Sequence, residues 1–347
     1  MDIESSHPTR TALHQAPWRE PGVSRGDHAG RGSDGVSADA LDAGSRSFEL
    51  RGRTVLLAMD ESAGAAAGAR VALALAKAHG ATVKVISVID SRSVPFPPAL
   101  DVALAIEDPD RDLTTHQEQV QELRASLARI TGEVIDWPIQ VVIGTPSSSI
   151  VEQAKRLNAA LTIVGLRRHG RLDRALNNET SLNVMRNSMC PVLGVVPGLT
   201  GLPVRILAAS DFSAISVIAS RTARAIASDG ALVVLAYVPP LTALLGDEGE
   251  RRIHDLGVRA AFEMAAHELG DDGVIFDHVV LDHDISKSTA ATLLEFAVSS
   301  HADLIAAGSS QRSHVERWMM GSVSTELVRD GSHSVLLVPA LRADRRA

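Results

Sequence analysis

The sequence of 347 residues contains one cysteine, Cys190, and only 3% aromatic residues, among them a single tyrosine. One cysteine excludes an internal disulfide and a zinc site built from several cysteines. The shortage of aromatic residues predicts a core of aliphatic side chains and alanine. No apolar run approaches the roughly 18 residues of a membrane helix, and the first residues lack the basic start and apolar stretch of a secretory signal. We therefore expect a cytoplasmic protein without a membrane partner.

A basic surface is also missing, because the formal net charge is −8. A protein that binds nucleic acid through phosphate contacts needs a basic face, so we expect no nucleic-acid partner. The hydrophobic share of 45% and the charged share of 22% are typical of a globular protein. The length suits two domains of about 150 residues.

Residues 1–50 differ from the rest, with six glycines, three prolines and no sustained apolar period. Such a segment buries too little apolar surface to offset the entropy of ordering it. We predict a disordered N-terminal tail.

The remaining chain is a tandem duplication. The apolar run of residues 55–62 returns at residues 206–213, and both runs end in Asp-x-Ser. A Cys-Pro-Val-Leu run from Cys190 likewise matches a His-Ser-Val-Leu run from His333. The repeat predicts one domain over residues 51–197 (copy one), a linker over 198–203 and a second domain over 204–341 (copy two).

Each copy alternates short Val/Ile/Leu runs with longer segments that carry helix signals. Ser62 and Ser213 are natural N-caps of the first helix, and Gly80 and Gly230 are natural residues to end it. Apolar residues of copy one mark one face of a second helix, at Leu113, Val120, Leu123, Leu127 and Ile130, and of a third, at Ile150, Val151, Ala154 and Leu157. The pattern predicts two α/β domains, each a doubly wound parallel sheet with helices on both faces.

Ligands of such sheets bind outside the carboxyl ends of the strands, where the strand order reverses. In copy two, Gly308 ends the fourth strand and a Gly-Ser pair, Gly321 and Ser322, opens the next helix. A glycine lets the backbone approach a phosphate, and free N–H groups at a helix start attract an anion.

This layout resembles the universal stress protein family, whose nucleotide-binding members carry Gly-x2-Gly-x9-Gly-Ser/Thr ahead of a Cys-Pro-Val-Leu-Val-Val strand. The resemblance covers residues 53–340 as two copies. It implies five-stranded sheets in the order 3-2-1-4-5, pairing of the copies through strand five, and adenosine held between strands one and four. In such members an Asp lies at the end of strand one, and the phosphates lie on the glycine motif.

The match is more complete in copy two than in copy one. Copy one keeps Asp60 and Gly165, but Arg168, Asn178 and Glu179 replace the second glycine, the third glycine and the serine. A carboxylate there repels phosphate, and we expect Arg168, on the turn after strand four, to neutralise it. We therefore expect at most one ATP or other adenine nucleotide per chain, in copy two. The expected site comprises Asp211, Val238, Gly308, Gln311 (where the family has its middle glycine), Gly321 and Ser322.

Structural roles remain open for several of these residues. Asp60 and Asp211 suit helix capping alone, and Gly308 and Gly321 suit turns. The basic run of Arg167, Arg168, His169, Arg171 and Arg174 suits either a solvated loop or an anion grip. Metal-ligand residue types gather at His278, Asp282, His283 and Asp284 without a zinc pattern. Cys190 suits a packed, inert thiol.

No Walker motif and no Gly-x-Ser-x-Gly elbow occurs in the sequence. We therefore expect a stress-response protein of the binding type, a nucleotide-dependent regulator rather than an enzyme. The alternative is a scaffold that binds no nucleotide and acts on an unknown protein partner; slow ATP hydrolysis in copy two is a third reading. The terminal strand of copy one, about residues 191–196, is expected to pair with that of copy two, about residues 334–338.

Overall fold

A computed structural model describes residues 48–92, 109–167, 179–269, 275–282, 284–309 and 320–340. The side chains of residues 109–116, 244 and 275 are also outside the description. The predicted tail lies outside it up to residue 47. Its last residues are described: Leu50 is buried in the core, and Phe48 packs against the same core.

Copy one alternates strands and helices as the sequence predicts. Its elements are β1 (Thr54–Ala58), α2 (Ala63–His79), β2 (Thr82–Asp90), α4 (Pro109–Thr131), β3 (Ile139–Gly144), α5 (Pro146–Arg156), β4 (Leu161–Gly165), α6 (Glu179–Asn187) and β5 (Val192–Val195). Copy two repeats this order, with a short helix, α8, between its second strand and its long helix; the equivalent residues of copy one, 93–108, lie outside the description. Its elements are β6 (Arg205–Ala209), α7 (Ala214–Ala225), β7 (Leu232–Tyr237), α8 (Leu241–Leu245), α9 (Glu248–Leu269), β8 (Ile275–Val280), α10 (Thr289–Ser299), β9 (Leu304–Ser309), α11 (Ser322–Asp330) and β10 (Ser334–Pro339).

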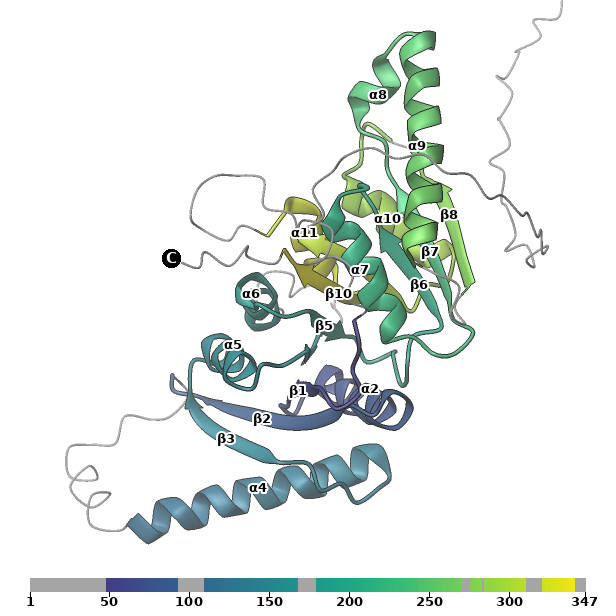
Figure 1. Cartoon of the computed structure of the whole chain (residues 1–347). Helices are drawn as coiled ribbons and strands as arrows, with labels where there is room; N and C mark the ends of the chain where they lie inside the picture. The colour runs from purple at the N-terminus through teal and green to yellow at the C-terminus, as the bar shows by residue number, and fades with distance from the viewer. Residues whose placement is uncertain are drawn as a thin grey trace, which may run out of the picture. The chain divides into compact units, whose positions relative to one another are not determined.

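The described strands form one ten-stranded sheet in the order β3-β2-β1-β4-β5-β10-β9-β6-β7-β8 (Figure 1). Each half is parallel and has the order 3-2-1-4-5, so the predicted fold is confirmed. The halves join where β5 and β10 run antiparallel, with Leu193 opposite Leu336 in the register. The predicted pairing of the two terminal strands is also confirmed, and it removes two exposed edges at once.

The core lies on both faces of this sheet because successive strand residues point to opposite sides. Val55 and Leu57 of β1 join one cluster, together with Leu127 of α4 and Phe262 of α9. Leu56, between them, joins the other cluster, which includes residues of α5, α6, α10 and α11. Each cluster contains residues of both copies, so the core continues across the joined strands.

The capping predictions are confirmed at three of four positions. The hydroxyls of Ser62 and Ser213 accept hydrogen bonds from the first turns of α2 and α7, and Gly80 ends α2 with φ +65°. The prediction for Gly230 is wrong, because α7 already ends at Ala225, with Ile226 as its C-cap. There the chain turns to the linker: the N–H of Ser228 donates to the Pro203 carbonyl, 3.0 Å away.

Candidate functional site

The candidate site lies at the carboxyl ends of two neighbouring strands in each copy. β1 pairs with β4 in copy one, and β6 pairs with β9 in copy two. Asp60 and Asp211 follow the first strand of each pair, while Gly165 and Gly308 stand at or near the end of the second. The pairing of these strands is what brings each Asp-x-Ser turn beside the glycine of strand four.

Neither aspartate caps the first helix directly. The Asp60 carboxylate accepts from the N–H of Ser62, 2.9 Å away, and the Ser62 hydroxyl accepts from the N–H of Ala65, 3.1 Å away. In copy two, Asp211 accepts from both the N–H and the hydroxyl of Ser213, the N-cap of α7. The aspartate therefore fixes the turn, and the serine caps the helix.

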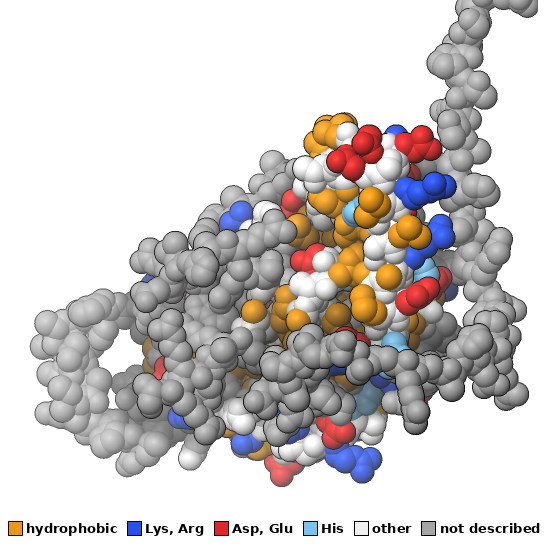
Figure 2. All heavy atoms as spheres, turned by 45° about the horizontal axis from the view of Figure 1, so that its top comes forward, with side chains coloured by type: hydrophobic (Ala, Val, Ile, Leu, Met, Phe, Trp, Pro, Cys, Tyr) orange, Lys and Arg blue, Asp and Glu red, His pale blue; other side chains and the backbone are white. Residues whose placement is uncertain are grey.

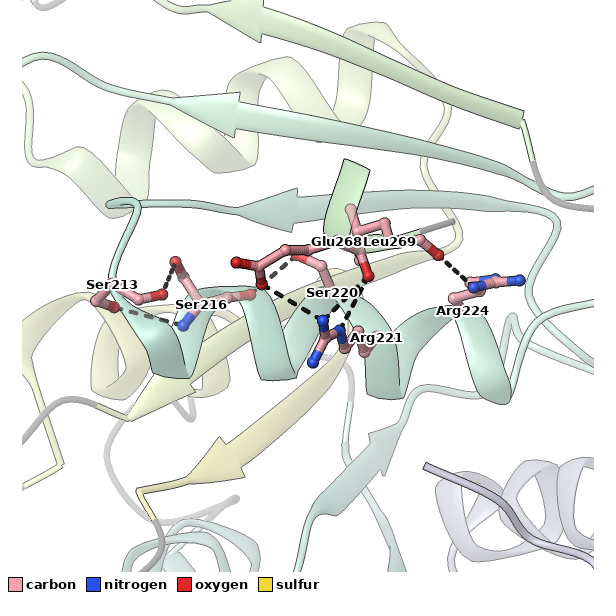
Figure 3. A network of polar contacts seen from close by, with 7 residues as sticks. All are labelled: Ser213, Ser216, Ser220, Arg221, Arg224, Glu268 and Leu269. Atoms are coloured by element: carbon pink, nitrogen blue, oxygen red, sulfur yellow. Dashed lines mark hydrogen bonds and ion pairs between the residues drawn. The ribbon is translucent and has the colours of Figure 1, made fainter. Parts of the chain in front are cut away.

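Asp211 is exposed, and its hydrogen bonds keep it ionised. Partial desolvation by the surrounding protein raises the pKa of this carboxyl, but hydrogen bonds from Ser213 and Ser216 outweigh it and lower the pKa below its ordinary value. Figure 3 shows Ser213 and Ser216 side by side at the start of α7. A carboxylate held in this way accepts hydrogen bonds from ligand hydroxyls at neutral pH.

An aromatic cluster adjoins this turn, and the sequence analysis missed it. Phe212 has φ +59°, a left-handed conformation that is strained for a bulky side chain. Its ring centroid lies 4.8 Å from that of Tyr237 and 4.9 Å from that of Phe262. Burial and then the charge of Asp211 raise the pKa of the Tyr237 hydroxyl. No sequence pattern could have found it, because the three residues come from separate parts of copy two and no periodicity links them.

Gly308 has a packing reason to be glycine. A Cβ at Gly308 would lie 2.9 Å from a side-chain carbon of Ile215 and 3.0 Å from its backbone carbonyl carbon. In copy one, a Cβ at Gly165 would lie 2.4 Å from the backbone nitrogen of Ala65. Both glycines allow the first helix to approach strand four closely, whatever ligand is present.

Gly321 and Ser322 open α11 without a capping side chain. Gly321 is the N-cap, no side chain bonds to the first turn, and a Cβ placed there would meet nothing within 4 Å. Ser322 is exposed. The N–H groups of this turn have no side-chain acceptor among the described residues, as an anion site requires. Val238 is half-buried against the core, and Gln311 lies outside the described residues.

Copy one has a cleft at the equivalent place, which the sequence analysis did not anticipate. It measures about 240 Å³ and has an apolar wall that includes Ile86, Ile150 and Val164. Its polar lining residues are Asp60, Ser62, Arg167, Thr180 and Ser181. The Ser181 hydroxyl donates to the Gly165 carbonyl, 2.8 Å away, so α6 is tied to the end of β4.

Glu179 begins α6, where copy two has the exposed Ser322. Its carboxylate lies 3.5 Å from the Arg329 guanidinium, which belongs to α11 of copy two. Arg168, the expected partner of Glu179, and Asn178 lie outside the described residues. A carboxylate in the first turn of α6 interacts favourably with the positive end of its own helix.

The other predicted residues are placed only in part. The His278 ring lies 4.5 Å from the Phe262 ring, and Asp284 accepts from Ser286. Asp282 is exposed, whereas His283 and the basic residues His169, Arg171 and Arg174 lie outside the described residues. The half-buried Cys190 thiol lies 3.3 Å from the Thr162 hydroxyl. Within the described part of the chain, no helix is long and apolar enough to cross a membrane.

Comparison with known proteins agrees with this architecture. A universal stress protein of Thermus aquaticus is 30% identical over 141 residues, which are 41% of this chain and 96% of the relative. The solved structure of a universal stress protein from Archaeoglobus fulgidus matches 84% of this chain and 98% of its own, with 17% identity and a TM-score of 0.56. A universal stress protein solved in complex with cAMP matches 43% of this chain and 99% of its own, with 17% identity and a TM-score of 0.29. The model of the universal stress protein family matches residues 52–196 and again 204–339, so the chain belongs to this family and carries its domain twice.

Proposed function

We propose that this protein is a cytoplasmic stress-response regulator that binds one adenine nucleotide, in copy two. The observation that carries the proposal is the uncapped start of α11 at Gly321 and Ser322. Several backbone N–H groups, one hydroxyl and the positive end of the helix are available there to phosphate oxygens. Binding, rather than turnover, is the proposed activity.

Asp211 is the proposed sugar ligand of this site. Its hydrogen bonds from the Ser213 turn favour the ionised form, which accepts from ribose hydroxyls. Val238, just beyond the end of β7, lies at the edge where the adenine would be held. The ribose hydroxyls of the nucleotide would donate to Asp211, and its phosphates would accept from the N–H groups at the start of α11.

Copy one is proposed to hold no phosphate. Its cleft lies beside the first turn of α6, and Glu179 brings a carboxylate to that turn. Two anionic groups at short range repel each other by about 1 kcal/mol or more. Glu179 forms an ion pair with Arg329 of copy two, so its carboxylate serves a contact between the copies rather than a ligand site.

Titration calorimetry with ATP tests the proposal on three proteins. We expect one ATP per wild-type chain with a dissociation constant no tighter than about micromolar. Gly321→Glu brings a carboxylate to the phosphate site and should abolish the heat, whereas Glu179→Ser should leave ATP binding in copy two unchanged. Undiminished heat in Gly321→Glu would place the ligand elsewhere, with the copy-one cleft as the next candidate.

The scaffold alternative has its own supporting observation. Gly308 is explained by its close approach to Ile215 without any ligand. If Gly308 is needed only for packing, its presence at the end of strand four does not indicate that a nucleotide binds there. Absence of ATP heat in all three proteins would favour this alternative, in which the surfaces of the paired copies contact a protein partner.

A further inference from the structure

Helix α9 has an exposed apolar stripe on the side that faces away from the core. Ile253, Leu256 and Met264 are 72%, 62% and 63% exposed, and Ala260 is exposed between them. Spacings of three and four residues place these side chains on one face of the helix. Figure 2 shows hydrophobic side chains gathered on the side of the molecule where α8 and α9 come forward.

The opposite face of α9 already has its partners. Val258, Phe262, Ala265 and Leu269 are buried in the core. At the C-terminal end, Arg221 and Arg224 of α7 donate to the carbonyls of Glu268 and Leu269 (Figure 3). The helix is therefore fixed to α7 by one face, and the apolar stripe is not needed for that packing.

The duplication supplies an internal comparison, because α4 occupies the same place in copy one. The exposed positions of α4 include Gln117, Glu118, Gln121 and Glu122. None of the large apolar side chains that are exposed in the described part of the chain belongs to α4. Over the side chains that the structure describes, the fold therefore tolerates a polar face on this helix in copy one, and the stripe is found in copy two.

We propose that a second copy of this chain docks on the stripe, with the two α9 helices antiparallel. The two-fold axis is perpendicular to both helices and crosses each of them midway between residues 257 and 260. This arrangement places Ile253 of one chain opposite Met264 of the other. Leu256 and Ala260 then lie near the axis. Such an interface is closed and self-complementary, which is the usual form of a homodimer.

One pair of opposite charges favours this direction of pairing. Arg252 and Glu263 flank the stripe on the same side, three helical turns apart, so the antiparallel arrangement places each Arg252 near Glu263 of the second copy. No ion pair joins either residue to another residue that the structure describes. In a parallel two-fold pair, Arg252 of one chain and Glu263 of the other would lie on opposite sides of the stripe and could not meet. The N-terminal segment is a poorer occupant, because residues 1–50 have no sustained apolar period.

A helix pair buries less area than the standard interface of about 1,600 Å², so a dimer of about micromolar affinity is expected. Sedimentation equilibrium of the full-length chain from about 1 to 100 µM measures it directly. Leu256→Glu should weaken the dimer about tenfold or more, since it places a carboxylate near the axis. Gln121→Glu, at an exposed position of α4, is the matched control and should change nothing.

A charge exchange tests the direction of pairing with variants that leave the apolar stripe intact. Glu263→Arg should weaken the dimer, and Arg252→Glu added to it should restore the wild-type dissociation constant. A chain that stays monomeric at the highest concentration overturns the proposal. A monomer is also the result expected if the N-terminal segment, rather than a second copy, covers the stripe. So does a dimer that is insensitive to Leu256→Glu. Failure of the double variant to restore association overturns the antiparallel arrangement.

Discussion

The ring of Phe212 packs on the ring of Tyr237, with 4.8 Å between the centroids, although Phe212 has φ +59°. A left-handed backbone costs a residue other than glycine about 1 kcal/mol or more. The packing of this ring against Tyr237 and Phe262 therefore has to offset the strain. In copy one the equivalent residue, Glu61, has no positive φ.

This relationship predicts that glycine is a better replacement for Phe212 than alanine. Phe212→Ala loses the ring contacts and keeps the strained backbone, so we expect a loss of about 2 kcal/mol in the free energy of unfolding. Phe212→Gly loses the same contacts but relieves the strain, and should be about 1 kcal/mol more stable than Phe212→Ala. Urea unfolding measures both. At Glu61 the order should reverse, with alanine more stable than glycine; the same order at both positions would contradict the strain argument.

The ionisation of Tyr237 should report the charge of Asp211. Burial and the Asp211 carboxylate both raise the pKa of the tyrosine hydroxyl, because each disfavours the phenolate. Tyr237 is the single tyrosine of the chain, so its ultraviolet absorbance on titration gives this pKa without interference. We expect ionisation above the ordinary value of about 10, and a lower pKa in Asp211→Asn. Asp60→Asn, at the equivalent position of copy one, should leave the titration unchanged; an equal shift there would exclude a local effect.

The strand-four glycines should be required for stability in the absence of ligand. Gly165→Ala brings a Cβ to 2.4 Å from a backbone nitrogen, and we expect a loss of about 3 kcal/mol. Gly308→Ala brings a Cβ to 2.9 Å from a side-chain carbon and 3.0 Å from the backbone carbonyl carbon of Ile215, a less severe approach, so a loss of about 1–2 kcal/mol is expected. Gly201→Ala meets nothing within 4 Å and serves as the control, with a change within about 0.5 kcal/mol. Wild-type stability of Gly308→Ala together with lost ATP heat would show that Gly308 serves the ligand rather than the packing.

The repeated Asp-x-Ser turns, the serine caps and the short apolar strands were sufficient to predict two doubly wound α/β domains, whereas the strand order 3-2-1-4-5 came from the family resemblance. These features are local: a cap needs a hydroxyl one turn from an N–H group, and a strand buried on both faces needs consecutive apolar residues. The pairing of β5 with β10 followed as well, because two apolar terminal strands would otherwise be exposed edges. Asp211, Gly308 and Gly321 could be assigned to one end of one sheet because they stand at or beyond the carboxyl ends of its parallel strands.

Tertiary structure alone decided which distant side chains meet. Glu179 and Arg329 are separated by 150 residues, and their contact depends on how α6 and α11 lie on the joined sheet. Phe212, Tyr237 and Phe262 come from three elements, and no periodicity links them. α7 likewise ends before Gly230, and the N–H of Ser228 that follows it donates to the Pro203 carbonyl of the linker instead of to a helical carbonyl. The sequence determines backbone conformation and burial over a few turns, whereas side-chain contacts between elements depend on the packing geometry of the whole domain pair.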